Sequence, residues 1–206
     1  MELLLIRHAL PVRREVADGS ADPELAEAGH RQAEHLAAYL SQEKLDAVYA
    51  SPLRRARQTA APLGSSQARP VVIVDGVAEY DRDSNEYVPM EELKASGDPR
   101  WHAMLAGEWP NSDVPRHVWE ADVVRTVEGL VDAHPGQKIA VVCHGGVLSA
   151  YLGWVLKVPD SQSFFYPNYT SIHRVAAARS GERSILTVNE TAHLRGTGLP
   201  IGLYAG

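Results

Sequence analysis

The residues of this 206-residue chain best suited to chemistry are histidines and arginines that directly follow short apolar segments. Guanidinium groups bind anions, and a neutral imidazole is both a nucleophile and a proton acceptor. The candidates form three groups: Arg7-His8, the cluster Arg54, Arg55 and Arg57, and His144-Gly145-Gly146. Together they predict a site for an anionic ligand.

The elements that must position these groups alternate along the chain. Apolar runs predict strands at 3–6, 44–50, 71–74 and 138–143, and two further strands at 170–177 and 183–188 joined as a hairpin. Helical patterns cover 23–40, 51–63, 120–133 and 145–156. We therefore expect the α/β fold class, a three-layer sandwich with helices on both faces of a mostly parallel central sheet. Its parallel strands would direct all three groups toward one crevice.

Two helix starts are predicted from a capping residue followed by a first-turn proline, at Asp22-Pro23 and at Ser51-Pro52. The second start places Arg54 and Arg55 in or just after the first turn, where the helix dipole disfavours a cation by up to about 1 kcal/mol. This position indicates a functional role, and a solvated helix face is the alternative. We expect one arginine of the cluster to face the crevice and the other two to lie on the surface.

The stretch 77–119 has a different texture, with scattered prolines and more acidic than basic side chains. We interpret it as a small cap of short helices and loops, inserted into a single domain that spans 1–206. A helix that opens at Gly145 would present free backbone N–H groups to an anion. Cys143 precedes His144, but successive strand residues point to opposite faces, so Cys143 is predicted to fill the core.

Composition limits the classes of function. Hydrophobic residues make up 45% and charged residues 22% of the chain, as in ordinary globular proteins. The net charge of −6 argues against a nucleic-acid partner, and the single cysteine excludes an internal disulfide. The apolar run 3–6 is too short for a signal peptide, and no run approaches the ~20 residues of a membrane span. We expect a cytoplasmic protein without a membrane partner.

Three motifs carry a family resemblance: Leu5-Ile6-Arg7-His8, Ser51-x-Leu53-x-Arg55-Ala56-x-Gln58-Thr59-Ala60 and Val142-x-His144-Gly145-Gly146. In their order and spacing they resemble the histidine phosphatase (phosphoglycerate mutase-like) superfamily. Residues 25–33 resemble the first helix of that family, and residues 189–194 its closing segment. The resemblance covers nearly the whole chain and is weakest between Glu79 and Trp119.

The resemblance implies a phosphatase that hydrolyses a small phosphorylated metabolite through a phosphohistidine, with no metal ion and no cofactor. It implies that His8 is the nucleophile, that Arg7 and Arg55 clamp the phosphoryl oxygens, and that His144 completes the site. Neighbouring arginine charges should keep the pKa of His8 low and the imidazole neutral. The resemblance also mildly suggests a homodimer.

The same resemblance places Glu79 as the general acid. The Gly-x-Trp-Glu-Gly stretch that usually follows in the family is absent, so Asp81 is a rival for this role. Gly145 is expected to contact the substrate. The stretch 10–13 stands where the family has polar side chains that line the site. Arg13 or Arg14 is either a substrate ligand in their place or a solvated loop charge.

Two other functions compete with the phosphatase. The first is a cofactor-dependent phosphoglycerate mutase, an isomerase that must hold a highly anionic intermediate; the acidic cap and a C-terminal end with Arg195 as its one Lys or Arg beyond Glu190 disfavour it. The second is a non-catalytic regulatory module that binds a phosphate ligand. Retention of both arginines and both histidines argues against that module.

Overall fold

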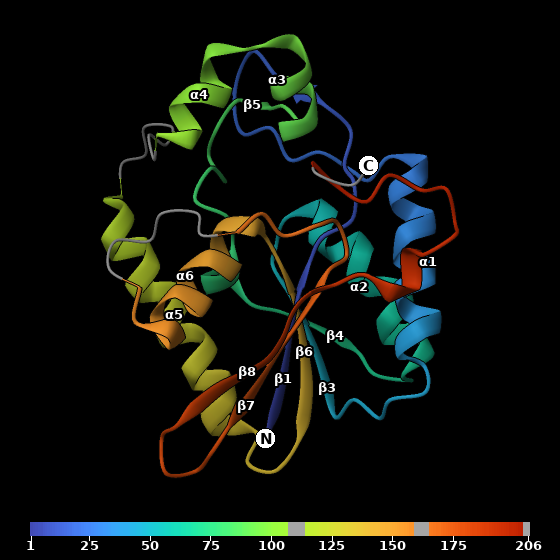
Figure 1. The fold of residues 1–206 in the computed structure, drawn as a ribbon, viewed down its shortest axis with the longest axis vertical. Helices are drawn as coiled ribbons and strands as arrows, with labels where there is room; N and C mark the ends of the chain where they lie inside the picture. The colour runs from blue at the N-terminus through green and yellow to red at the C-terminus, as the bar shows by residue number, and fades with distance from the viewer. Residues whose placement is uncertain (107–113, 159–164, 204–206) are drawn as a thin grey trace.

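The computed structural model describes residues 1–106, 114–158 and 165–203 (Figure 1). A six-stranded sheet with the order β4-β3-β6-β1-β7-β8 runs through the molecule. Strands β4, β3, β6 and β1 are parallel to one another, whereas β7 is antiparallel to β1 and β8 is antiparallel to β7. The strands span Glu2–Arg7 (β1), Ala47–Ala50 (β3), Val71–Ile73 (β4), Lys138–Cys143 (β6), Ile172–Ala177 (β7) and Arg183–Glu190 (β8).

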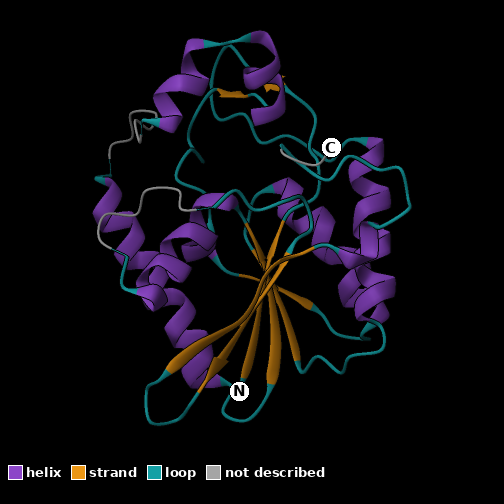
Figure 2. Cartoon of the chain, viewed as in Figure 1, coloured by secondary structure: helices purple, strands orange, loops and turns teal. Residues whose placement is uncertain are grey.

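Helices cover both faces of this sheet, as Figures 1 and 2 show. Alternate residues of β1 enter different cores: Leu4 and Ile6 pack with α1 and α2, whereas Leu3 and Leu5 pack with α5 and α6. All four side chains are fully buried, which explains why this strand is apolar along its length. The predicted three-layer α/β sandwich is confirmed. The four helices span Glu27–Leu40 (α1), Arg54–Ser66 (α2), Arg116–Ala133 (α5) and Gly145–Leu156 (α6).

Both proline-based helix starts are wrong. Helix α1 begins at Glu27, because Leu25 instead bridges to Pro11 and its N–H donates to the Gln58 side chain. Asp22 caps the other helix: its carboxylate accepts a hydrogen bond of 2.8 Å from the N–H of Arg54, the first residue of α2. A capping side chain thus comes from a segment 32 residues away in the sequence.

Other predicted boundaries are nearly right. Strand β6 and helix α6 have the expected limits, and β7 and β8 form the expected hairpin. Helix α5 begins at Arg116 rather than near Glu120. Strand β7 begins at Ile172 because Thr170 has a positive φ of 53°, which is incompatible with a strand.

Residues of the predicted cap lie beyond the carboxyl ends of the parallel strands, at the top of Figure 1. They include β5 (Glu86–Tyr87), α3 (Met90–Ser96) and α4 (Pro99–Leu105), and residues 107–113 lie outside the described part. An N-terminal segment contributes too, because β2 (Arg14–Glu15) pairs antiparallel with β5. Two short 3₁₀ helices, η1 (Asp75–Val77) and η2 (Ala192–Leu194), complete the elements. Within the described residues, no helix is long and apolar enough to cross a membrane.

The topology creates one switch point in the sheet. The chain leaves β1 toward α1 on one face and leaves the neighbouring strand β6 toward α6 on the other face. In α/β sheets the space beyond such strand ends is open to a ligand, because the two connections diverge there. His8 follows β1 and His144 follows β6, so both histidines are at this point.

Candidate active site

Three polar residues lie side by side because three adjacent parallel strands end close together: β1 and β6 end in register, and β3 ends one residue earlier. Arg7 pairs with Cys143 across β1 and β6, and Ala50 pairs with Val142 across β3 and β6. The next residues along each strand are His8, His144 and Ser51. The rings of His8 and His144 are 5.1 Å apart between centroids. The structure therefore brings together the two histidines singled out from the sequence.

The His8 side chain is held in one tautomer. Its Nδ1 lies 2.8 Å from the carbonyl oxygen of Ala9, and since a carbonyl can only accept, Nδ1 carries the proton. The lone pair is therefore on Nε2. Burial lowers the pKa of His8 well below its ordinary value of 6.5, and the positive charges of Arg55 and Arg7 lower it further. His8 is neutral at pH 7, with Nε2 unprotonated.

Arg7 lies against the loop 165–171. Its Nη1 donates to the carbonyl oxygen of Pro167 at 2.6 Å. Its guanidinium carbon lies 4.8 Å from the ring centroid of Tyr166 and 4.4 Å from that of Tyr169. A Cβ on Gly145 would lie 4.0 Å from Nε, so the first residue of α6 is next to the guanidinium.

Arg55 is the buried member of the arginine cluster. Its side chain is 2% exposed, whereas that of Arg54 is 41% exposed and Arg57 lies on the surface. The prediction that one of the three faces inward is therefore confirmed. The Arg55 guanidinium lies over the ring of Tyr87, 4.7 Å from its centroid, and 3.6 Å from the Asp81 carboxylate.

Ser51 contacts the second histidine. Its hydroxyl lies 2.7 Å from Nε2 of His144 and accepts a hydrogen bond from the N–H of Leu53 at 3.3 Å. The predicted helix cap is therefore a partner of His144. His144 is fully buried, and burial together with Arg55, His8 and Arg7 lowers its pKa well below 6.5.

Glu79 reaches the start of α6. Its carboxylate accepts hydrogen bonds from the N–H groups of Gly146, at 2.9 Å, and Tyr80, at 3.0 Å. A Cβ on Gly146 would come within 2.3 Å of a Glu79 oxygen, so only glycine allows this approach. The expected anion-binding N–H at this helix start is thus used, at Gly146, by a side chain of the protein itself.

Two carboxyl groups have raised pKa values here. Burial raises the pKa of Glu79, and the charge of Asp81 raises it further. Burial also raises the pKa of Asp81, against which the Arg55 charge acts. Hydrogen bonds from the N–H groups of Gly146 and Tyr80, together with the Arg55 charge, act against the rise in the pKa of Glu79.

Buried donors without partners mark this site. In the part of the chain that the structure describes, four buried side-chain nitrogens have no hydrogen-bond partner. Three of them belong to this site: Nε of Arg7, Nε of Arg55 and Nδ1 of His144. An unsatisfied buried polar group costs about 1–3 kcal/mol, so three in one place indicate a ligand that accepts hydrogen bonds. The fourth is Nδ1 of His193.

The structure does not gather every candidate. Arg13 is half exposed and pairs with Glu15 and, at 3.7 Å, with Glu92. Sequence reasoning missed the contacts between tyrosine rings and the two arginines: Tyr166 and Tyr169 lie against Arg7, and Tyr87 lies against Arg55. It also missed Thr59, whose hydroxyl accepts a hydrogen bond from the N–H of Ala9 at 2.9 Å and donates one to the carbonyl of Arg55 at 2.7 Å. Thr59 was visible only as part of the second motif.

Among residues 1–106, 114–158 and 165–203, no three His, Cys, Asp or Glu side chains are grouped as ligands of an ion. Cys143 is fully buried in the core between α5, α6 and the sheet, as predicted, and burial raises the pKa of its thiol.

Known proteins match this chain over nearly its whole length. A model of the histidine phosphatase superfamily (branch 1) matches residues 3–191. Phosphoserine phosphatase 1 of Hydrogenobacter thermophilus is 29% identical over 202 residues, which cover 94% of each chain. A mutant phosphoserine phosphatase of Entamoeba histolytica, solved with phosphoserine, has a TM-score of 0.73 at 24% identity, covering 94% of this chain and 98% of that chain.

A second solved structure has the same fold. Mycobacterial glucosyl-3-phosphoglycerate phosphatase, in complex with inorganic phosphate, has a TM-score of 0.75 at 23% identity. It covers 93% of this chain and 98% of that chain. At this level of identity the likeness concerns the fold.

The sheet order and the cluster at its switch point define an α/β protein that gathers cations at the carboxyl ends of parallel strands. The family match then narrows this class. The chain belongs to the histidine phosphatase superfamily, branch 1, as its three motifs indicated. It is a phosphatase of the histidine phosphatase type.

Proposed function

We propose that the chain hydrolyses phosphomonoesters of small metabolites in two steps, with a phosphohistidine on His8 between them. The observation that carries this proposal is the set of three unpartnered buried nitrogens around a neutral imidazole. A phosphoryl group in transfer spreads negative charge over three equatorial oxygens. Fixed donors from Arg7, Arg55 and His144 would meet those oxygens without rearranging.

In the first step, Nε2 of His8 attacks phosphorus and the bond to the ester oxygen breaks. The hydrogen bond from Nδ1 to the Ala9 carbonyl keeps Nε2 unprotonated and orients the ring. Ser51 donates its hydroxyl proton to Nε2 of His144, so that Nδ1 of His144 carries the proton that a phosphoryl oxygen accepts.

Protonation of the leaving alkoxide is assigned to Glu79. The charge of Asp81, held ionised by Arg55, keeps the Glu79 carboxyl protonated. After the first step Glu79 is ionised and can take a proton from water, which attacks phosphorus and releases phosphate from His8. The proton returns Glu79 to its starting state. Asp81 acts on the reaction through Arg55 and Glu79.

The substrate class is a small phosphorylated metabolite. Relatives of this chain are named phosphoserine phosphatase and glucosyl-3-phosphoglycerate phosphatase, and two of the solved ones hold phosphoserine or inorganic phosphate. These names support a phosphatase with a small substrate, and they favour neither phosphoserine nor glucosyl-3-phosphoglycerate as that substrate.

Rapid mixing with p-nitrophenyl phosphate tests the two-step reaction. We expect a burst of nitrophenolate equal to the concentration of active sites, followed by slower turnover, and phosphate trapped on His8 by acid-free denaturation and mass spectrometry. Turnover with no phosphorylated protein under any quench would contradict the covalent intermediate.

Phosphate release also separates the phosphatase from a mutase. With 3-phosphoglycerate as substrate, we expect free phosphate to appear at a rate that does not depend on added 2,3-bisphosphoglycerate. Isomerisation to 2-phosphoglycerate that requires the bisphosphate would replace this proposal with the mutase function. Binding of phosphate without release from any ester would instead support a regulatory module.

A further inference from the structure

Arg7 and Arg55 differ in how their charges are balanced. Arg55 lies 3.6 Å from the carboxylate of Asp81, whereas no carboxylate within the described ranges forms an ion pair with Arg7. Arg7 is 5% exposed, and its nearest partners are aromatic rings and a carbonyl. Its position is therefore set by the Pro167 carbonyl and by whatever fixes the two rings, Tyr166 and Tyr169.

Both rings are held by one side chain of the cap. The hydroxyl of Tyr169 donates to Oε2 of Glu91 at 2.8 Å, and that of Tyr166 donates to Oε1 at 3.4 Å. Glu91 lies in the first turn of α3, 75 and 78 residues away in the sequence. A single carboxylate thus fastens two neighbouring rings of loop 165–171 to the cap, and the Arg7 guanidinium lies against both.

The residues that affect the pKa of Arg7 include the same two tyrosines and Glu91. Burial opposes the charge of Arg7, whereas Tyr166, Tyr169, Tyr87 and Glu91 raise the pKa of its guanidinium above the ordinary value. Burial raises the pKa of both tyrosines as well, so both hydroxyls stay protonated and donate. Two neutral tyrosines therefore lie between Glu91 and Arg7, in place of a direct ion pair. A direct pair would occupy the guanidinium N–H groups that a phosphoryl oxygen needs.

We propose that Glu91 is a positioning residue for the phosphate site: through Tyr166 and Tyr169 it holds the Arg7 guanidinium in place. This inference rests on the proposed function in that Arg7 binds the phosphoryl group. It adds a link between the cap and the chemistry, since a shift of α3 moves the rings that hold Arg7. Misplacement of a catalytic group by about 1 Å can lower a rate by roughly 10²-fold.

Helix α3 supplies a matched control. Glu92 is also a carboxylate of the first turn of α3, and it pairs with Arg13 at 3.7 Å. Glu91→Ala and Glu92→Ala remove the same charge from the same helix turn, so a general effect on α3 would appear in both. Glu91→Gln keeps an oxygen that can accept a hydrogen bond and serves as the conservative variant.

The test is the dissociation constant of inorganic phosphate, measured by titration calorimetry, together with KM and kcat for p-nitrophenyl phosphate. We expect Glu91→Ala to weaken phosphate binding about 10-fold and to raise KM by a similar factor. Glu91→Gln should recover most of the loss, and Glu92→Ala should leave both constants within about 2-fold. Urea unfolding of each variant separates this effect from a loss of stability.

Combination with Arg7→Lys distinguishes positioning from direct contact with the ligand. If Glu91 acts through Arg7, Glu91→Ala causes no further loss of phosphate binding in the Arg7→Lys chain. An equal loss in both backgrounds, or none in the original chain, would overturn the proposal. Phosphate binding can be measured without turnover. A chain that binds phosphate but hydrolyses no ester would contradict the proposed function, and the binding constants of the variants would still test the role of Glu91.

Discussion

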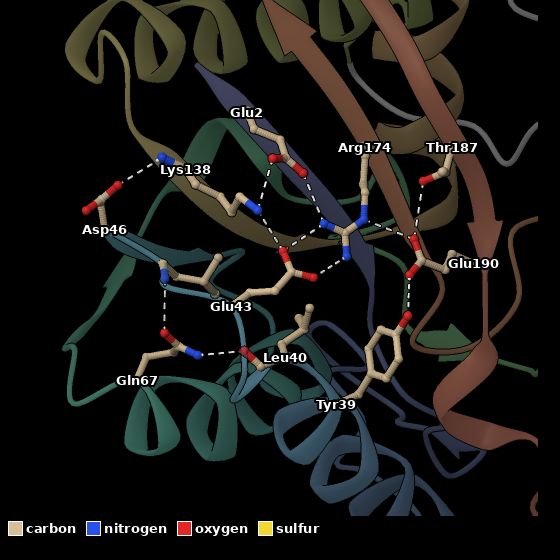
Figure 3. A network of polar contacts seen from close by, with 11 residues as sticks. Glu2, Tyr39, Leu40, Glu43, Asp46, Gln67, Lys138, Arg174, Thr187 and Glu190 are labelled. Atoms are coloured by element: carbon tan, nitrogen blue, oxygen red, sulfur yellow. Dashed lines mark hydrogen bonds and ion pairs between the residues drawn. The ribbon is translucent and has the colours of Figure 1, made fainter.

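Two groups of charged side chains in this molecule differ in whether their hydrogen bonds are satisfied. Near the amino ends of β1 and β6, Glu2 and Glu43 accept hydrogen bonds from Arg174, which lies opposite Leu4 in β7 (Figure 3). Arg174 also donates to Glu190 at the end of β8, so all three of its guanidinium nitrogens have partners. Lys138 pairs with Glu2 at 3.0 Å and Glu43 at 2.8 Å. At the carboxyl ends, Arg7 and Arg55 each keep a buried Nε without a partner in the described chain.

Carboxyl groups show the same difference. At the amino ends, hydrogen bonds from Arg174 are the main cause that lowers the pKa of Glu43 to about 2. At the carboxyl ends, burial and Asp81 raise the pKa of Glu79. The Arg174 network has all its hydrogen bonds made and stabilises the fold. Unpartnered donors and a carboxyl group with a raised pKa are instead typical of a site that binds a ligand. The residue types are the same, and their partners tell the two uses apart.

Removal of the nucleophile should have the largest effect. We expect His8→Ala to lower kcat for p-nitrophenyl phosphate roughly 10⁵-fold, since no other group in the site is placed to accept the phosphoryl group. His173 is the matched control, because it is buried and both its ring nitrogens have partners, Ser171 Oγ and the N–H of Asn189. His173→Gln should reduce stability and leave kcat within a few-fold.

An equal loss of activity in His8→Ala and His173→Gln would contradict this prediction. It would mean that hydrogen-bond partners do not distinguish the catalytic histidine from a structural one. Circular dichroism and urea midpoints of both chains are needed beside the rates, because either substitution changes a buried residue.

The second-largest effect tests Glu79 and Asp81, the two carboxyl groups whose pKa values are raised. We expect Glu79→Gln to lower kcat for an alkyl phosphate about 10³-fold, because the alkoxide leaves without a proton. With p-nitrophenyl phosphate, whose leaving group needs no proton, the nitrophenolate burst should persist and only the later turnover should slow. Asp81→Asn should lower the pKa of Glu79, and the alkaline limb of the pH profile should move to lower pH.

The sign of the pH dependence follows from the two groups. His8 must be neutral, and its lowered pKa keeps it neutral below pH 6.5. Glu79 must be protonated, so kcat for the alkyl phosphate should fall as pH rises through its raised pKa. A profile with the same alkaline limb in Glu79→Gln would assign that limb to another group and return the acid role to Asp81.

Arginine-to-lysine substitutions test the comparison most directly. Lysine keeps the charge and loses the planar set of donors. We expect Arg7→Lys and Arg55→Lys to lower kcat/KM for p-nitrophenyl phosphate about 10²-fold, in the range of a lost transition-state donor. Arg174→Lys should leave kcat/KM unchanged and lower the urea midpoint. A loss of activity on Arg174→Lys comparable to the other two would mean that the two ends of the sheet are not independent.

The strand ends of the site were predictable from the sequence because they depend on local patterns. The change from an apolar run to polar residues predicts the carboxyl end of a buried strand, as it does just before His8 and His144. The arginine cluster was identified by a local conflict with the helix dipole, and Arg55 is its buried member.

The surroundings of Arg7 were not predictable, because they depend on contacts between distant segments. Tyr166 and Tyr169 lie in the segment 165–171, whose sequence has no periodic pattern, and Glu91 belongs to a short cap helix. Asp22 shows the same limit: its cap on α2 arises from packing of two loops, so the local capping signal named the wrong helix. Side-chain partners across the chain require the tertiary structure, whereas element types mostly do not.

The last predicted effect concerns stability rather than activity, at the Arg174 network. Arg174→Met removes the cation from three carboxylates, and we expect the free energy of unfolding at pH 7 to fall by about 3 kcal/mol. The pKa of Glu43 is about 2 in the folded chain against an ordinary value of 4.5, so its contribution is present above pH 4.5 and is lost as pH falls toward 2. The difference in stability between the two chains should therefore shrink over this range.

Urea titrations at a series of pH values between 7 and 2.5 measure that difference. In the original chain the unfolding free energy should decline steeply below pH 4.5, and in Arg174→Met the decline should be shallower, because Glu43 no longer has its main partner. Lys138 stays beside Glu43 and keeps part of the effect. Parallel curves for the two chains would mean that Arg174 stabilises the sheet through packing of its alkyl stem, and that the charges in Figure 3 contribute little.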